Sequence, residues 1–204
     1  MPADQDQIDG RTARRDRNRE AVLDAVLDLF REDAMTPTPA QVAARSGVST
    51  RSVQRYFEDM DSLVRAAMAH HLERVGPLFE IPGLGLGPLA ERVERMVTNR
   101  LRLYAEVAPL VRAAMLRIRS NPLIRARLAT ARAQMRAQTA AMFAPELDAL
   151  APDAGRDVLD AVDALLAFDA LELLRVGLDR SEADATRVLT GALGALLGPS
   201  APPP

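Results

Sequence analysis

One short segment gathers the side chains that could bind a polyanion. Residues 50–56 carry two arginines, one amide and three hydroxyl groups, and no acidic residue occurs from position 34 to position 57. Guanidinium and amide groups hydrogen-bond to base edges in the DNA major groove, whereas hydroxyl groups commonly bond to phosphate. The candidates for these contacts are Thr50, Arg51, Ser52, Gln54, Arg55 and Tyr56.

Two short helices joined by a tight turn must position these side chains. Thr38-Pro39-Ala40-Gln41 predicts a helix start, because Thr38 suits the N-cap, proline suits the first helical position and Gln41 completes a capping box. Gly47 is placed to end that helix with a positive φ, and Ser49 is placed to cap a helix over about residues 50–57. The pattern predicts a helix-turn-helix, with a plain helical hairpin as the alternative.

The order of these elements resembles the TetR family of bacterial transcriptional regulators. The similarity covers about residues 17–75 and includes the Ala-Ala-x-x-Gly-Val-Ser turn and a helix that ends in Arg-Tyr-Phe before an Asp-rich cap. The resemblance implies a DNA-binding repressor rather than an enzyme. It also implies a homodimer, a palindromic operator and an unidentified small-molecule effector as partners.

The resemblance assigns roles by position within the recognition helix. The residues that match its exposed positions are Thr50, Arg51, Ser52, Gln54 and Arg55, and Tyr56 matches the aromatic residue or histidine that usually touches phosphate. Members commonly carry a phosphate-binding lysine at the start of the fourth helix, where this sequence has Met60 and Asp61. That contact is lost here or passes to the N-terminus of the helix.

The composition favours an all-α fold with about nine helices in two domains. Only 3% of the 204 residues are aromatic, while the strong helix formers alanine, leucine and arginine are abundant. Proline and glycine interrupt the helical periodicity at 76–88, at Pro109 and at Pro152, and a long eighth helix is expected over 154–177. We expect a flexible arm (1–15), a DNA-binding domain (16–75), a ligand-binding and dimerisation domain (76–199) and a tail (200–204).

Several other function classes find little support in the residues. The chain has no cysteine, and its two histidines, His70 and His71, are adjacent and so diverge by about 100° on a helix. We therefore expect no metal, no cofactor and no catalytic residue, and an enzyme or a helical adaptor protein is the rival interpretation. No apolar run approaches the roughly 18 residues of a membrane span, so a cytoplasmic protein with no membrane partner is expected.

The second domain contains candidates for an effector pocket. Arg100 lies on the same stripe of its helix as Val93, Val97 and Tyr104, which should face inward, and a buried guanidinium needs a partner. That partner is either Asp163 or Asp169, in a structural ion pair, or the carboxylate or phosphate of a ligand. Flexible methionines and scattered aromatics suit an adaptable cavity, and the candidates are Met96, Arg100, Tyr104, Met115, Met135, Phe143 and Phe168.

The last two helices are candidates for a twofold interface. They carry apolar residues over more of their circumference than one core contact requires, and a four-helix bundle with a second copy would bury the excess. The candidates are Leu165, Leu173, Val188, Leu189, Leu193 and Leu196. Charge is also segregated, with eleven arginines and three glutamates in 91–136 but eleven acids and four arginines in 146–187, and we expect these segments to neutralise each other.

Overall fold

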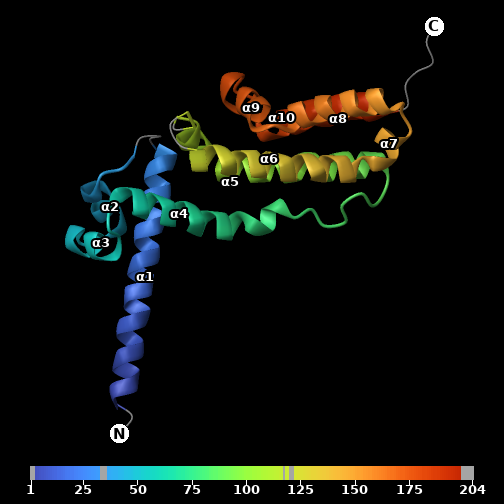
Figure 1. Ribbon diagram of the computed structural model, residues 1–204. Coiled ribbons are helices and arrows are strands. Elements are labelled where there is room, and N and C mark those ends of the chain that lie inside the picture. The colour runs from blue at the N-terminus through green and yellow to red at the C-terminus, as the bar shows by residue number, and fades with distance from the viewer. Residues whose placement is uncertain (1–2, 33–35, 117, 120–121, 199–204) are drawn as a thin grey trace. The chain divides into compact units, whose positions relative to one another are not determined.

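The chain is helical throughout the part that the structure describes. In a computed structural model, residues 3–32, 36–116, 118–119 and 122–198 are described, and their regular structure contains no strand (Figure 1). The predicted all-α class is therefore confirmed. Within these ranges no helix is both long and apolar enough to cross a bilayer.

The chain divides into two compact units, and α5 contributes to both. The first unit contains the residues up to Arg74 together with Pro109–Leu116, and the second contains Val75–Ala108 together with the residues that follow position 117. The helices that open the chain are α1 (Ala3–Glu32), α2 (Pro39–Ser46), α3 (Thr50–Tyr56) and α4 (Met60–Val75).

A continuous apolar core holds the first unit together. Val22, Val26 and Phe30 of α1 are buried with Val42 of α2 and Val53 of α3. Their spacing of four residues along α1 puts one face of this helix against the helix pair. Figure 1 shows α2 and α3 beside the C-terminal half of α1.

The start of α1 differs from the sequence prediction. We expected a flexible arm over 1–15 and a helix from residue 16, but α1 already begins at Ala3. No proline occurs from residue 3 to residue 32, and this segment contains six arginines and four alanines. Arginine and alanine both favour a helix, so the expected arm is a helical extension.

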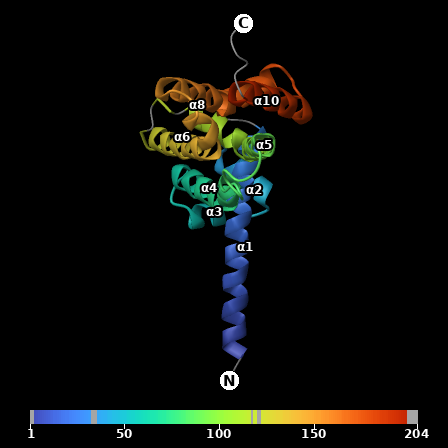
Figure 2. The same cartoon turned by 90° about the vertical axis from the view of Figure 1, so that its right-hand side faces the viewer.

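The second unit is built around α5 and the helices that follow it. Its elements are η1 (Gly76–Phe79), α5 (Leu89–Met115), α6 (Pro122–Met142), α7 (Ala144–Asp148), α8 (Pro152–Leu166), α9 (Phe168–Glu172), the π-helical turn η2 (Leu173–Gly177) and α10 (Glu182–Leu197). In Figure 2, α8 lies next to α6 and α10, with which it makes contact.

Two helix boundaries correct the sequence prediction. Pro109 was expected to end a helix, but α5 continues through it to Met115 because Leu110 and Ala113 are buried in the core of the first unit. Conversely, the expected helix over 154–177 is broken at Ala167, whose ψ of 154° is extended, and it continues as α9 and η2. The described residues therefore form ten α-helices rather than about nine.

A buried arginine joins α5 to α7. The Arg92 guanidinium is 4% exposed and donates hydrogen bonds to the Met142 carbonyl (2.6 Å), to the Gly87 carbonyl (3.0 Å) and to both carboxylate oxygens of Glu146. Two guanidinium nitrogens thus bond to the two oxygens of one carboxylate, and this bidentate geometry is the strongest form of an arginine–carboxylate contact. The hydrogen bond from Arg92 holds the pKa of the Glu146 carboxyl below its ordinary value of 4.5.

We expect Glu146→Gln to lower the free energy of unfolding by about 2 kcal/mol, because a bond to a charged partner is lost at a buried guanidinium. Urea denaturation measures this change. The wild-type contribution should be complete above pH 4.5 and should fall as the pH drops through the lower folded-state pKa. Asp153→Asn is the control, since the Arg156–Asp153 pair is exposed and should contribute little. Equal effects of the two variants would contradict this account.

Candidate nucleic-acid interface

Side-chain caps fix the ends of α2 and α3. The Thr38 hydroxyl accepts a hydrogen bond from the Gln41 backbone N–H (3.3 Å), and the Gln41 side chain accepts one from the Thr38 N–H (2.8 Å). Gly47 ends α2 with a φ of +68°, and the Ser49 hydroxyl caps α3 by accepting from the Ser52 N–H (3.3 Å). These local bonds confirm the predicted helix-turn-helix geometry.

The two faces of α3 differ in chemistry. Val53 and Phe57 are buried in the core of the first unit. Thr50, Arg51, Gln54 and Arg55 are exposed, so these candidate DNA-binding residues share the outward face of one short helix.

Ser52 and Tyr56 are half-buried, and both side chains are held by contacts within α3 and its cap. The Ser49 hydroxyl donates a hydrogen bond to the Ser52 hydroxyl at 3.1 Å, which ties Ser52 to the cap of α3. The Tyr56 ring lies 5.3 Å from the Arg55 guanidinium carbon, a cation–π distance that orients the arginine. Ser52 therefore also takes part in the cap of α3, and Tyr56 lies against Arg55, while DNA contacts by both residues stay predictions.

The arginines on α3 have no carboxylate partner among the described residues. Arg45 at the end of α2 pairs with Glu32 at 2.6 Å, but no ion pair engages Arg51 or Arg55. Sequence analysis did not single out Arg19, whose guanidinium carbon lies 5.3 Å from the Phe57 ring. This contact joins α1 to the end of α3, and no spacing rule in the sequence could have indicated it.

The N-terminus of α4 already has an anionic partner. The Asp59 carboxylate accepts a hydrogen bond from the Ser62 backbone N–H at 2.6 Å, and this bond lowers the pKa of the carboxyl. A carboxylate at this end occupies the position that a phosphate would need. Where family members commonly have a phosphate-binding lysine, this chain could lose that contact or make it through the N-terminus of α4. The structure favours loss of the phosphate contact.

Most of the candidate effector residues lie in or beside the apolar core of the second unit. Met96 and Phe143 are fully buried in the apolar core of the second unit, and Tyr104 is buried there too, donating a hydrogen bond to Glu172 at 2.6 Å. Met135 and Phe168 are half-buried. Met115 is exposed and belongs to the first unit, so it cannot line a pocket within the second.

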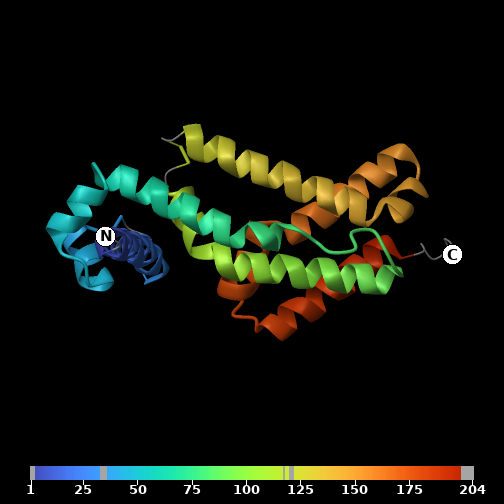
Figure 3. The same cartoon turned by 90° about the horizontal axis from the view of Figure 1, so that it is seen from below.

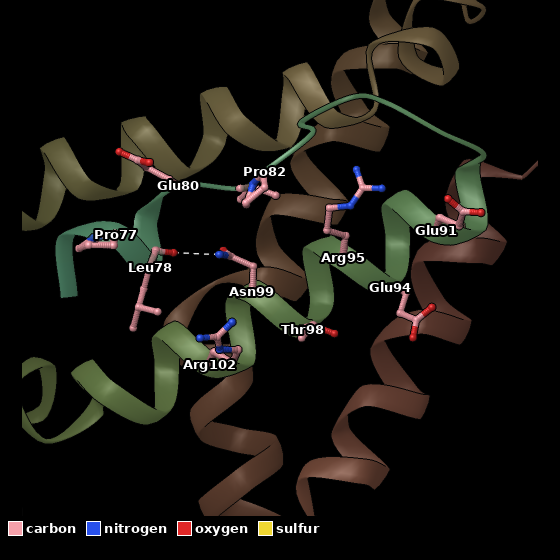
Figure 4. A pocket seen from close by; sticks show the side chains of 11 residues that line it. Pro77, Leu78, Glu80, Pro82, Glu91, Glu94, Arg95, Thr98, Asn99 and Arg102 are labelled. Carbon is pink, nitrogen blue, oxygen red and sulfur yellow. Dashed lines mark hydrogen bonds between the residues drawn. The ribbon is translucent and has the colours of Figure 1, made fainter. Parts of the chain in front are cut away.

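A pocket of about 540 Å³ lies instead between residues 76–82 and α5. Its α5 wall is polar and charged, whereas the other wall is largely apolar. Figure 4 shows Asn99 pointing across it toward Leu78. The lining residues are Pro77, Leu78, Glu80, Ile81, Pro82, Glu91, Glu94, Arg95, Thr98, Asn99 and Arg102, and none of the predicted effector residues is among them.

Arg100 is buried, but its hydrogen bonds go to neutral groups. Its side chain donates to the Asn99 carbonyl oxygen (3.0 Å), the Gln138 carbonyl oxygen (3.1 Å) and the Met135 backbone carbonyl (3.1 Å), at 2% exposure. The predicted direct ion pair with Asp163 or Asp169 is wrong. Asp163 pairs with Arg136 at 3.6 Å and acts on Arg100 only through its longer-range charge.

Burial raises the free energy of the charged form of Arg100. Desolvation lowers the pKa of its guanidinium to about 10, and the charge of Asp163 offsets only part of that effect. The shift corresponds to about 3 kcal/mol in favour of the neutral form. A cation in this environment must therefore be held by several acceptors at once.

The candidate interface residues separate into two groups. Leu189 and Leu193 are fully buried within the chain, so their assignment to an interface between two copies is wrong. They face inward because α10 contributes one of its faces to the core of the second unit. Leu173, Val188 and Leu196 are exposed to 57%, 40% and 37%, and Leu165 is half-buried.

The predicted neutralisation between the basic and acidic segments occurs at a few specific pairs. Arg92 bonds to Glu146, and Arg136 reaches Asp160 and Asp163 of α8. Among the described residues no cluster of histidine and acidic side chains has the arrangement of a metal site.

Comparisons with known proteins agree with this architecture. No family model matches the chain. It is 32% identical over 89 residues to the HTH-type transcriptional repressor LfrR of Mycolicibacterium smegmatis, covering 44% of this chain and 47% of that protein. The chain thus matches about half the length of this curated relative.

A solved structure gives broader coverage. The crystal structure of a TetR-family transcriptional regulator from Streptomyces coelicolor matches with a TM-score of 0.62 at 22% identity, covering 88% of this chain and 79% of that one. The fold is therefore the TetR-family fold. Both matches agree with the family resemblance found in the helix-turn-helix sequence.

We expect Gly47→Ala to lower the free energy of unfolding by about 1–2 kcal/mol. An added Cβ would meet no atom within 4 Å, so the cost comes from the left-handed backbone alone. Gly191→Ala is the control, because that helical glycine also has open space around it and alanine should stabilise α10. Denaturation followed by circular dichroism measures both variants, and a stabilised Gly47→Ala protein would contradict the assigned turn.

Proposed function

We propose that this chain, which has the TetR-family fold and the helix-turn-helix sequence of that family, is a DNA-binding transcriptional repressor. One observation carries the proposal. Arg51 and Arg55 lie exposed on α3, with no acidic residue in the helix pair and no carboxylate partner among the described residues. Cations without partners on a rigid, capped helix are suited to a polyanionic ligand.

The chemistry of this face distinguishes DNA from other polyanions. An arginine side chain can form two hydrogen bonds with one guanine, and a glutamine side chain can form two with one adenine. Four nearby positions on α3 carry such polar side chains, at Thr50, Arg51, Gln54 and Arg55. A helix of this kind fits the major groove of B-form DNA. The deep, narrow major groove of an RNA duplex does not admit side chains in the same way.

We also propose that the protein acts as a homodimer on a palindromic operator. Leu173, Val188 and Leu196 are exposed apolar residues on η2 and α10, and a second copy would remove them from water. Two copies related by a twofold axis would present two α3 helices to two half-sites. A selection of bound sequences from random DNA should then return an inverted repeat.

The effector is proposed to be a small molecule with a carboxylate or phosphate group. Arg100 supports this class, since its guanidinium is buried and its hydrogen-bond acceptors are all neutral. An anion would form a stronger, charge-assisted bond there than an amide oxygen does. Binding that favours the DNA-incompetent state lowers operator affinity through linkage.

Arg51→Ala should weaken specific DNA binding by about 1–3 kcal/mol per half-site, with relaxed preference at the contacted base pair. Fluorescence anisotropy with the selected operator and with single-base variants measures both effects. Arg156→Ala is the control, because it removes the same charge from an exposed side chain of α8. Unchanged affinity and unchanged base preference in Arg51→Ala would refute the assignment of α3.

Leu196→Glu should convert a dimer into a monomer, because a charge would replace an apolar side chain at the proposed interface. Light scattering at micromolar concentration should give twice the 22.1 kDa of the chain for the wild type and the single mass for the variant. Leu86→Glu is the control, since Leu86 is 69% exposed and lies outside α10. A wild-type mass of one chain at every concentration would refute the dimer.

A further inference from the structure

The segment that follows α4 is tied to α5 and α6 through two side-chain amides. This strap, residues 76–88, runs antiparallel to α5 (Figure 3). Asn99 of α5 donates to the Leu78 carbonyl at 2.8 Å, and Gln138 of α6 donates to the Phe79 carbonyl. Two consecutive carbonyls of η1 are thus held by amides from two different helices.

A single cation orients both amides. One terminal nitrogen of Arg100 donates to the Asn99 oxygen at 3.0 Å and to the Gln138 oxygen at 3.1 Å. With their oxygens directed at the guanidinium, both amides must direct their NH₂ groups at the strap. A reversed amide would turn its donor toward a cation and its oxygen toward a carbonyl, and both contacts would be repulsive.

We propose that Arg100, Asn99 and Gln138 form a latch that holds the strap closed, with Arg100 as the positioning residue. The strap provides one wall of the 540 Å³ pocket and carries the buried Ile81. Release of the two amide bonds would therefore open this pocket toward the apolar core of the second unit. The opened site would offer Arg100 to a ligand anion.

The latch also gives the proposed effector response a physical route, and this part rests on the proposed function. An anion that binds the Arg100 guanidinium would replace its hydrogen bonds to the oxygens of Asn99 and Gln138. The two amides would then no longer be held with their NH₂ groups toward the strap, so the strap is released. The strap begins at Gly76, directly after α4 ends at Val75. Its release frees the C-terminal end of a helix whose earlier turns belong to the DNA-binding unit.

Gln138→Glu separates the latch from a purely structural role of these residues. The new carboxylate keeps an acceptor for Arg100 and adds a charge, but it loses the donor to the Phe79 carbonyl. Core stability should be retained or raised while the strap is released. Gln134→Glu is the matched control, because Gln134 is exposed one turn earlier on the same helix and receives the same change.

Hydrogen exchange of the full chain without DNA measures the strap directly. The Glu80 N–H donates to the Pro77 carbonyl at 3.2 Å, so its exchange rate reports whether η1 is intact. In Gln138→Glu this rate should rise about tenfold at an unchanged or higher melting temperature, while Gln134→Glu should match the wild type. Equal Glu80 exchange in the two variants would overturn the latch.

DNA binding of the same variants tests the regulatory step separately. Gln138→Glu imitates a bound anion, so its operator affinity should fall about tenfold relative to Gln134→Glu. A released strap with unchanged operator affinity would overturn the coupling and leave the latch in place. If the wild type bound no DNA, the proposed function would fail, whereas the exchange result would still decide the latch.

Discussion

Buried arginines need hydrogen-bond acceptors, and this need determines how the elements around α5 are placed in the second unit. Arg92 and Arg100 both lie on α5 and are 4% and 2% exposed. Because a buried guanidinium without acceptors is costly, the surrounding elements must bring oxygen atoms to fixed positions. The Gly87 and Met142 carbonyls and Glu146 meet around Arg92, whereas Met135, Asn99 and Gln138 meet around Arg100. The loop before α5 and the helix after it are positioned by these two side chains.

The two arginines satisfy this need in different ways, and the difference has functional meaning. Arg92 has a carboxylate in a paired arrangement, which neutralises it and leaves no capacity for another anion. Arg100 has neutral acceptors, so its charge is solvated by dipoles and stays available. On α3 the contrast is complete, because Arg51 and Arg55 are exposed and have no acidic partner among the described residues. The pairing state thus separates Arg92, whose charge is neutralised, from the arginines for which a ligand is proposed.

Local signals in the sequence predicted the helix-turn-helix well, because its determinants lie within a few residues of one another. The capping box of Thr38 and Gln41, the positive φ of Gly47 and the cap at Ser49 each follow from spacing alone. Packing between residues far apart in the sequence was harder to predict. Pro109 failed to end α5 because Leu110 and Ala113 are held in the core, and Ala167 broke a helix that periodicity extends without interruption. At Pro109 tertiary contacts overrode a local preference.

The partner of Arg100 shows why the second site was harder to predict than the first. The inward stripe of α5 correctly indicated a buried cation that needs a partner. Charge favoured Asp163 or Asp169 as the partner. Asp163 faces Arg136, however, and amides from α5 and α6 occupy the space beside Arg100. Asn99 and Gln138 carry no signal in a single sequence, since amides are common on exposed helix faces. Their role depends on having a donor and an acceptor in one group, which lets each accept from a cation on one side and hold a carbonyl on the other. A carboxylate could satisfy Arg100 but could not hold the strap, so the choice of amides follows from the second contact rather than the first.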